Sequence, residues 1–504
     1  MTQKVRAEPS VLKAAEHHHF KARGRWLLFD VNALTVMSSC ELDRCILNHA
    51  AHGATKQQLV EAAVGEGATR SETRLRITAL VRSRFLLPRD ESPRLAKLGT
   101  PTGYATFMVN VSQRCNLTCS YCYVNKGHFD YVDKPIPRMT AETADEIVDR
   151  IHTNFPSFGT YGYHFYGGEP LMNFKAIDRI VRSAEAKAKA TGTYADYHIT
   201  TNGTLLTREI ADFMSDHRFT VYFSIDGDEQ NHDELRRYVN GKGSFKHVEK
   251  NLEYLRTRPG VHLIGSSVIR SGFSLADALQ QLKTHGASQC KAERVRLREG
   301  DHLSLNGAEH DNYVTDIEGL IEHYVESLAA GRKPMDFRLS SKVLQVYTRT
   351  RREFFCPAGD RMFGVSANGE LYPCALHVGR PQSKLGDIYQ GIDETARQAF
   401  RKRFSPTEQA ECRTCWTRHL CGGGCSAMVD RFGHEDCRSL RKESEAAIAV
   451  FQHFAESDPL QLLGIVSPTI VKWANGEISD ADGIAPTEPA ALRIRPDAED
   501  AAAT

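Results

Sequence analysis

Ten of the 13 cysteines fall into two groups whose spacing suits metal binding, and these are the side chains best able to do chemistry. The early group has three members: Cys115, Cys119 and Cys122. The late group has seven members: Cys356, Cys374, Cys412, Cys415, Cys421, Cys425 and Cys437. Cys40, Cys45 and Cys290 stand apart. We expect Cys40 and Cys45 to be a core pair on one helix and Cys290 to be a buried thiol.

The rest of the composition predicts a soluble cytoplasmic protein. No run of about 18 apolar residues occurs, and the first 20 residues lack the apolar stretch of a secretory signal. The 64 basic and 63 acidic side chains give a formal net charge of +1, so we expect no nucleic acid and no membrane among the partners. In a reducing compartment, regularly spaced cysteines are metal-ligand candidates and not disulfides.

The early cysteines are suited to an iron-sulfur cluster with an open site. Their spacing is C-x3-C-x2-C, directly after an apolar segment at 106–112. Three thiolates can hold three corners of a cubane cluster, which leaves the fourth iron free for a substrate or cofactor. The alternative is a structural zinc site that lacks one ligand. Zinc loops usually carry paired C-x2-C knuckles, so the iron-sulfur interpretation is favoured.

The elements around this loop alternate between strand and helix from Tyr104 onward. Strands are predicted at 106–112, 163–168, 197–203, 219–227 and 261–269, with helices near 141–155, 174–190, 208–216, 245–256 and 309–330. Repeated strand-helix units with apolar strands predict an α/β fold with a parallel sheet, open or barrel-like. Chemistry in such sheets lies at the carboxyl ends of the strands.

With Tyr121 as the aromatic residue, the early group reads C-x3-C-x-aromatic-C and resembles the signature of radical S-adenosylmethionine (SAM) enzymes. The resemblance implies a partial (β/α)6 barrel over 104–330 and catalytic roles for Cys115, Cys119 and Cys122. In that family, SAM chelates the open iron, and its one-electron reduction gives a 5'-deoxyadenosyl radical that abstracts hydrogen. The cofactor carries the hard chemistry, and the protein supplies binding and orientation.

Four further elements at strand ends match the family one by one. Gly167, Gly168, Glu169 and Pro170 resemble its GGEP element, in which Glu169 would accept a hydrogen bond from the SAM ammonium. By the same resemblance, Asn202 and Ser224 would lie near the ribose and methionine portions of SAM. Arg236 would pair with the SAM carboxylate. Strand-end polar residues often serve only as loop caps, which is the alternative for these last three.

Seven late thiolates with glycine-rich turns can hold two clusters, whereas one zinc ion would use four and leave three. Their spacing resembles the SPASM domain, expected here over 350–440, which holds two auxiliary four-iron clusters. The resemblance implies three [4Fe-4S] clusters in all. The outer auxiliary cluster would take Cys412, Cys415, Cys421 and Cys437. The inner one would take Cys356, Cys374 and Cys425, with an open iron because no cysteine lies just upstream of Cys356.

The segment 17–92 is predicted to be a small winged-helix module. It has two short strands near 20–24 and 25–30 and helices at 38–50, 55–65 and 71–86. Its place ahead of the barrel resembles the PqqD-like precursor-recognition elements of peptide maturases, which bind a leader peptide as an added strand. No basic stripe marks a nucleic-acid reader. The histidines at 17–19 are expected to be solvated, and 479–504 is expected to be a disordered tail.

Together these resemblances predict an oxidoreductase that modifies a ribosomally made peptide or small protein. The expected product is a thioether, as in thioether-forming maturases including the quinohemoprotein amine dehydrogenase system, because an open inner iron favours sulfur. Reduced flavodoxin or ferredoxin is the expected electron donor.

Three alternatives stay open. One is a maturase that forms carbon-carbon or carbon-oxygen crosslinks or epimerises a peptide. Another is an enzyme like the sulfatase maturases, although those carry an aspartate base where this chain has Ala375. The third, from another class, is a non-catalytic metal-binding regulator with a winged helix.

Overall fold

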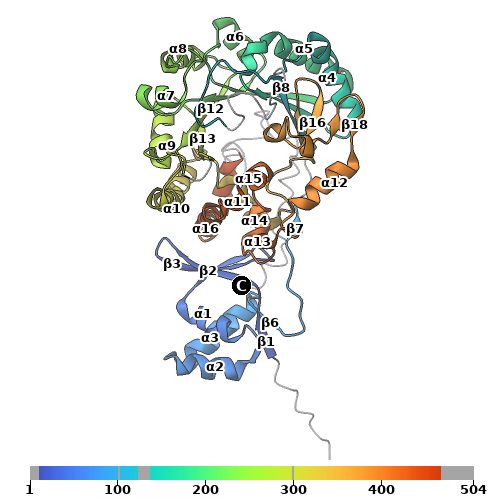
Figure 1. Ribbon diagram of the computed structural model, residues 1–504. Helices are drawn as coiled ribbons and strands as arrows, with labels where there is room; N and C mark the ends of the chain where they lie inside the picture. Colours follow the sequence, from blue (N-terminus) through green and yellow to red (C-terminus); the bar gives the residue numbers. More distant parts are fainter. Residues whose placement is uncertain (1–10, 100–102, 123–136, 298–299, 467–504) are drawn as a thin grey trace, which may run out of the picture.

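The computed structural model describes residues 11–99, 103–122, 137–297 and 300–466. The expected tail at 479–504 lies outside these ranges. Figure 1 shows three parts: a strand-and-helix barrel, a C-terminal region beside it, and a small N-terminal module. No helix among the described residues is long and apolar enough to cross a membrane.

The barrel is built on six parallel strands that lie side by side in chain order. These are β8 (Tyr104–Ser112), β9 (Thr160–Gly167), β10 (Tyr194–Thr201), β11 (Thr220–Ser224), β12 (His262–Ile269) and β13 (Gln289–Arg294). The helices between and after them form an arc around the outside of the strands (Figure 1). They are α4 (Ala141–Asn154), α5 (Phe174–Thr191), α6 (Arg208–Asp216), α7 (Glu229–Leu235), α8 (Phe245–Leu255), α9 (Leu275–Thr284) and α10 (Gly307–Ala329).

This arrangement confirms the predicted α/β fold with a parallel sheet. Each strand sends alternate apolar side chains outward to the helices, as Phe107, Val109 and Val111 of β8 do. On α4, Ile147 and Ile151 recur at helical spacing and are fully buried in the same core. The opposite positions of each strand face the inside of the barrel, where the chemistry is expected.

The C-terminal region is continuous with the barrel sheet. Strand β15 (Met362–Val365) pairs in parallel with β8, with Met362 opposite Thr106. Strands β16 (Glu370–Tyr372), β17 (Gly386–Asp387) and β18 (Gly391–Ile392) then extend the sheet in antiparallel order. Its helices are α11 (Ser340–Thr348), α12 (Glu394–Arg403), α13 (Ala410–Arg413), α14 (Arg418–Cys421), α15 (Ser426–Phe432) and α16 (Cys437–Ala455). Strands β7 (Lys97–Leu98) and β14 (Thr350–Arg351) form a separate short parallel pair.

The N-terminal module has two small sheets and three helices. One sheet has the order β5-β1-β6 and the other β2-β3-β4. The strands are β1 (Val11–Ala14), β2 (His17–Ala22), β3 (Arg25–Asp30), β4 (Val36–Ser39), β5 (Ala54–Thr55) and β6 (Leu86–Pro88). The helices are α1 (Glu41–His49), α2 (Lys56–Gly65) and α3 (Arg70–Arg82), close to the predicted positions. A separate apolar core holds them together, and the winged-helix assignment stays a prediction.

The module packs on the C-terminal region through its β2-β3-β4 sheet. Phe20 and Phe29 lie in one apolar cluster with Ile448 of α16. The prediction that the histidines at 17–19 are solvated is wrong, because β2 lies at this contact. The His18 ring stacks on Trp416 with 3.7 Å between ring centroids, and its Nε2 lies 2.9 Å from a carboxylate oxygen of Glu445. The spacing along the sequence gave no sign of a partner more than 400 residues away.

Candidate active site and metal-binding cysteines

The early cysteine loop is held against the GGEP element by backbone contacts that only glycine permits. The Gly168 N–H donates to the Ser112 carbonyl at 3.0 Å, and the Glu169 N–H donates to the Arg114 carbonyl at 2.9 Å. A Cβ atom at Gly168 would lie 2.3 Å from the Arg114 oxygen, and Gly167 has a φ of +127°. The two glycines are therefore required for the ends of β8 and β9 to meet.

The three early thiols lie within electrostatic reach of one another. Burial, together with the charges of Glu169, Cys119 and Cys122, raises the pKa of Cys115 to about 12. Two donors point at the Cys115 sulfur, the Leu117 N–H at 3.4 Å and the Asn202 amide at 3.8 Å. Such donors stabilise a thiolate. The loop thus gathers three thiols, and two donors are in place to stabilise the Cys115 thiolate.

Glu169 is fully buried, and its carboxylate ties the loop after β9 to the end of β10. Its carboxylate accepts hydrogen bonds from the Leu171 N–H at 3.0 Å, the Thr201 hydroxyl at 2.8 Å and the Asn202 N–H at 2.7 Å. Burial raises its pKa, although these donors lower it. The expected role of Glu169 toward a SAM ammonium stays a prediction. Its protein contacts already make it the residue that fixes Asn202 beside the Cys115 sulfur.

A buried network of Tyr121, Asp226 and Arg236 lies beside Cys119. The Arg236 guanidinium donates to the Tyr121 hydroxyl at 2.6 Å, and that hydroxyl donates to Asp226. Arg236 Nη1 is 3.6 Å from Asp226 Oδ2. The negative charges around Arg236 hold its pKa well above the usual value. Asp226 is a candidate site residue that the sequence motifs do not single out, although it directly follows Ser224-Ile225 at the end of β11.

One donor of this network is left for a ligand. Arg236 is 7% exposed, and its Nε is a buried nitrogen without a hydrogen-bond partner among the described residues. A buried unpartnered guanidinium nitrogen is costly unless something completes it. An anionic group such as the SAM carboxylate fits that position. The residues present are therefore compatible with SAM, with Arg236 held by Tyr121 and Asp226 as its support.

His232 of helix α7 supports the network through hydrogen bonds. The Asp226 N–H donates to His232 Nδ1 at 3.4 Å, so Nε2 carries the proton and donates to the Ser244 hydroxyl at 2.9 Å. That hydroxyl donates to the Arg236 carbonyl at 2.7 Å. Burial lowers the pKa of His232 to about 3, which keeps the ring neutral. Backbone positions on both sides of the charge pair are thus fixed.

Ser224 is half-buried at the end of β11. An ion pair that the sequence did not predict, between Lys291 and Glu293, lies two strands away in the same sheet. Ser224 is opposite Ser266 of β12, which is opposite Lys291 of β13. The Lys291 ammonium lies 3.7 Å from the Glu293 carboxylate, and about half of each side chain is accessible. The charges of Glu293, Tyr166, Tyr222 and Cys425 all act on Lys291 and raise its pKa. This pair therefore lies within electrostatic reach of Cys425, one of the late cysteines.

The late thiols fall into two groups by their electrostatic interactions, and the assignment of these groups to two clusters stays a prediction. The Cys374 thiol interacts electrostatically with Cys356 and Cys425. The Cys412 thiol interacts with the other three: Cys415, Cys421 and Cys437. Burial raises the pKa of Cys356 to about 11 and of Cys412 to about 12. One cavity is lined by these four outer cysteines and by Cys425, together with Gly423 and Arg441.

The spread of these sulfurs fits clusters better than single zinc ions. Four thiolates around one zinc at about 2.3 Å would lie roughly 3.8 Å apart. Among the described residues, only one trio of ligand atoms lies within 4.8 Å of one another, and it contains none of the ten grouped cysteines. Each sulfur of a cubane binds a different iron, so wider spacing is expected. The residues present are compatible with iron-sulfur clusters.

Near the inner set, no cysteine directly precedes Cys356 and no carboxylate follows Cys374. Upstream of Cys356 are Phe354 and Phe355, with Arg352 donating to the Phe355 carbonyl at 3.0 Å. Ala375 follows Cys374 and is fully buried. Cys290, by contrast, is buried as expected. Cys40 and Cys45 are only partly buried, and Cys40 precedes α1 as its N-cap, so they do not form the expected core pair.

Comparison with known families identifies two domains. Residues 109–268 match the radical SAM superfamily, and residues 356–416 match SPASM, an iron-sulfur cluster-binding domain. The barrel is thus a radical SAM domain and the C-terminal region a SPASM domain. These two matches show a radical SAM domain followed by a SPASM domain in one chain.

Known relatives include enzymes that mature sulfatases. A serine-type anaerobic sulfatase-maturating enzyme from Bacteroides thetaiotaomicron is 26% identical over 338 residues, which cover 62% of this chain and 80% of that one. A cysteine-type enzyme of the same description from Clostridium novyi is 24% identical over 326 residues, covering 62% and 85%. The solved structure "Native anSMEcpe with bound AdoMet" aligns with a TM-score of 0.59 at 20% identity. It covers 70% of this chain and 99% of that one, and it establishes a shared fold.

Proposed function

We propose that the protein uses SAM and iron-sulfur clusters to oxidise a residue within a ribosomally made peptide or small protein. The observation that carries this proposal is the joining of both cysteine groups in one sheet. The early loop follows β8, Cys374 follows β16, and β15 pairs with β8 between them. A substrate inside the barrel would be exposed to both groups.

The residues of the chain have separate roles in this proposal. When bound, reduced cluster and SAM supply a 5'-deoxyadenosyl radical that abstracts a hydrogen atom. Cys115, Cys119 and Cys122 would hold the SAM-binding cluster, and Arg236 Nε would hold the SAM carboxylate. Lys291 and Glu293 would contact the substrate, because they lie on the inner side of β13 within reach of Tyr222 and Cys425.

The product proposed is a thioether between a cysteine sulfur and a carbon atom. The inner set supplies Cys356, Cys374 and Cys425, and the residues before Cys356 supply no fourth thiolate. A substrate sulfur could complete such a set. Two auxiliary clusters, three in total, and reduced flavodoxin or ferredoxin as electron donor are part of the same proposal.

A second candidate is oxidation of a cysteine or serine to an aldehyde, as in sulfatase maturation. The sequence similarity to sulfatase-maturating enzymes favours it. Against it, Ala375 has no proton-accepting group and is fully buried. For this reaction Glu293 would have to accept the proton instead.

The N-terminal module is proposed to recognise the substrate peptide. It has its own core, it presents short strands at sheet edges, and it is attached to the SPASM domain by the His18–Trp416 stack. Binding remote from the reacting residue would let one site accept varied sequences.

The proposal is tested by mass spectrometry of a candidate precursor peptide after anaerobic incubation with reconstituted protein, SAM and a reductant. Loss of two hydrogens, with fragmentation blocked between a cysteine and its acceptor, supports the thioether. An aldehyde that a hydrazine traps supports sulfatase-type maturation. A protein that holds iron but forms no 5'-deoxyadenosine under reduction would overturn both, and would favour the metal-binding regulator.

A further inference from the structure

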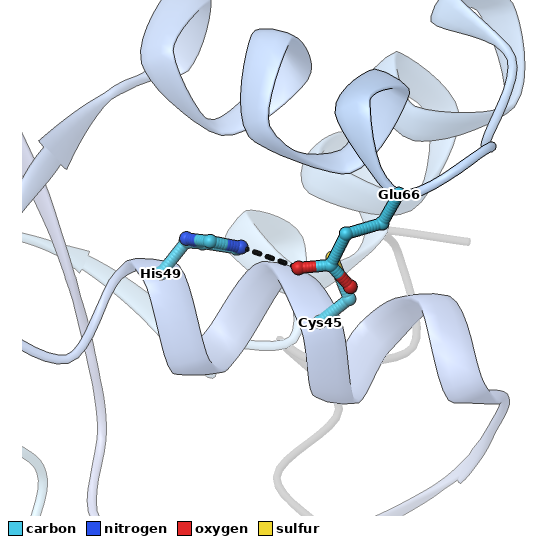
Figure 2. Close-up of side chains that lie close together, drawn as sticks. All are labelled: Cys45, His49 and Glu66. Carbon is cyan, nitrogen blue, oxygen red and sulfur yellow. Dashed lines mark hydrogen bonds and ion pairs between the residues drawn. The ribbon is translucent and has the colours of Figure 1, made fainter.

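The N-terminal module contains a trio of metal-ligand atoms that neither domain match includes. Figure 2 shows Cys45, His49 and Glu66 turned toward one another between α1 and the end of α2. The Cys45 sulfur, a ring nitrogen of His49 and a carboxylate oxygen of Glu66 all lie within 4.8 Å of one another. It is the one such trio that the described part of the chain holds.

The packing of the module fixes the three residues independently of their own contacts. Cys45 and His49 are four residues apart on α1 and so share a face. Ile46 and Leu47 are fully buried in the module core and set the rotation of α1. Glu66 is the C-cap residue of α2.

Helix α2, which ends next to Glu66, is also fixed in position. Thr55 and Gln58 form a capping box at its start, and Leu59 and Ala63 are buried in the same core. The trio is therefore preorganised by buried residues and not assembled from flexible loops.

The three side chains are joined by hydrogen bonds to Glu66. The His49 ring nitrogen lies 2.8 Å from a Glu66 oxygen. The Cys45 thiol is also hydrogen-bonded to Glu66. The Glu66 carboxylate thus contacts both other side chains, and the three ligand atoms already face one another.

We propose that Cys45, His49 and Glu66 form a zinc-binding site. A thiolate, an imidazole and a carboxylate are ligand types that zinc prefers. A tetrahedral site needs ligand atoms about 3.3 to 3.8 Å apart. The His49 nitrogen and the Glu66 oxygen are 2.8 Å apart, and all three ligand atoms lie within 4.8 Å of one another. Small rotations of the His49 and Glu66 side chains, which are 42% and 58% exposed, would bring the atoms to tetrahedral distances.

The exchange balances in charge and protons. The thiol releases its proton to solvent, and the imidazole moves its proton to the ring nitrogen that does not face the metal. One thiolate and one carboxylate then neutralise the two charges of the ion. The fourth position opens to solvent and takes a water molecule. The ion links α1 to the end of α2 and so stiffens the module proposed to bind the peptide.

The test measures zinc on the full chain after its clusters have been reconstituted anaerobically. The protein is dialysed against zinc chloride, passed over a weak chelating resin, and analysed for zinc and iron by mass spectrometry. The unmodified chain is expected to hold one more zinc per chain than Cys45→Ala, at equal iron content. Cys40→Ser is the matched control, because Cys40 lies in the same module at the start of α1, outside the trio.

His49→Ala supplies a second measurement, since an exposed histidine can be removed without emptying the core. Its zinc dissociation constant is expected to rise by at least about tenfold. X-ray absorption at the zinc edge is expected to show one sulfur and the rest lighter ligands. Equal zinc in the unmodified chain and Cys45→Ala, or equal loss in Cys40→Ser, would overturn the site. Because SAM cleavage is not the readout, failure here is distinguishable from failure of the proposed enzyme function.

Discussion

The two cysteine groups reach their positions in opposite ways. The early three lie within one loop, from Cys115 to Cys122, and strong buried charges surround them, including Glu169, Asp226 and Arg236. The late seven come from segments scattered between Cys356 and Cys437 and converge only when the domain folds. Among the described residues, Arg236 Nε at the early site has no hydrogen-bond partner, whereas the outer late set lines a cavity of the chain. We infer that the early site is built to exchange a bound ligand and the outer late site to retain its cluster.

The sharpest test of this difference is to remove one ligand on each side. Cys119→Ala is expected to reduce 5'-deoxyadenosine formation to the background level, because SAM cleavage needs the early cluster. Cys412→Ala is expected to keep SAM cleavage and to lose only the outer cluster. Both are checked by chromatography of the nucleoside and by iron per chain.

Cys40→Ser is the control for these variants, since it removes a thiol outside both groups. Persistence of SAM cleavage in Cys119→Ala would contradict the assignment of the early site. Loss of cleavage in Cys412→Ala at normal early-cluster iron would show that the two groups are not separable.

The reliance of the early site on buried charge predicts a large cost for Asp226→Asn. The substitution leaves Arg236 without its carboxylate, and breaking a buried pair costs about 3 to 5 kcal/mol. A fall of the unfolding midpoint in thermal melts of the cluster-loaded protein measures it. Asp178→Asn removes a partner of exposed Arg182 and is expected to change stability by less than about 1 kcal/mol. Similar shifts for the two variants would contradict the role of Asp226.

The dependence of stability on pH can be compared between the two regions, because each contains a buried histidine: His232 in the barrel and His377 in the SPASM domain. Burial lowers the folded-state pKa of His232 and of His377 to about 3, and both rings are fully buried. The unfolded chain therefore takes up these protons first as the pH falls below about 6.5. Each histidine is expected to cost about 2 kcal/mol of stability by pH 5 relative to pH 7.

His232→Gln and His377→Gln are each expected to flatten the dependence of stability on pH by that amount, measured in urea at several pH values. His302→Gln, on an exposed ring, is expected to leave the slope unchanged. A slope that neither buried variant alters would show that other groups dominate acid unfolding.

The smallest expected effect concerns the contact between the module and the SPASM domain. His18→Ala removes the stack on Trp416, which follows Cys415, and is expected to weaken local stability by about 1 kcal/mol. Faster hydrogen exchange in β2 is the readout. His52→Ala, on an exposed histidine of the same module, should leave exchange in β2 unaltered. Unchanged β2 exchange in His18→Ala would mean that Phe20 and Phe29 hold the contact without the stack.

Much of the barrel could be predicted because its signals are local. Phe107, Val109 and Val111 alternate with inward residues, and the helices that follow show regular apolar spacing. Strand β13 was not located, because Lys291 and Glu293 make its inner side polar and only Cys290 and Ala292 mark its outer side. A strand with two charged inner residues resembles a surface loop in sequence.

The sequence motifs predict which residues belong to the candidate site, but they do not predict the contacts between those residues. The cysteine spacing identified the ligands, and the GGEP element identified Glu169. The link from Tyr121 to Asp226 and Arg236 joins residues over 100 positions apart, and nothing in their local spacing indicates it. The same holds for the trio Cys45, His49 and Glu66, where the partner from α2 becomes visible only through helix packing.

The pairing of β15 with β8 has a consequence for synthesis on the ribosome. Strand β8 emerges early, but its partner Met362 emerges only after all the other barrel strands. At about 5 to 20 residues per second, the wait is on the order of 10 to 50 s. During that interval one edge of the nascent barrel has no neighbour, next to the loop that carries Cys115. Chaperones and cluster-delivery factors would find that edge open, and the arrival of the SPASM domain would close it.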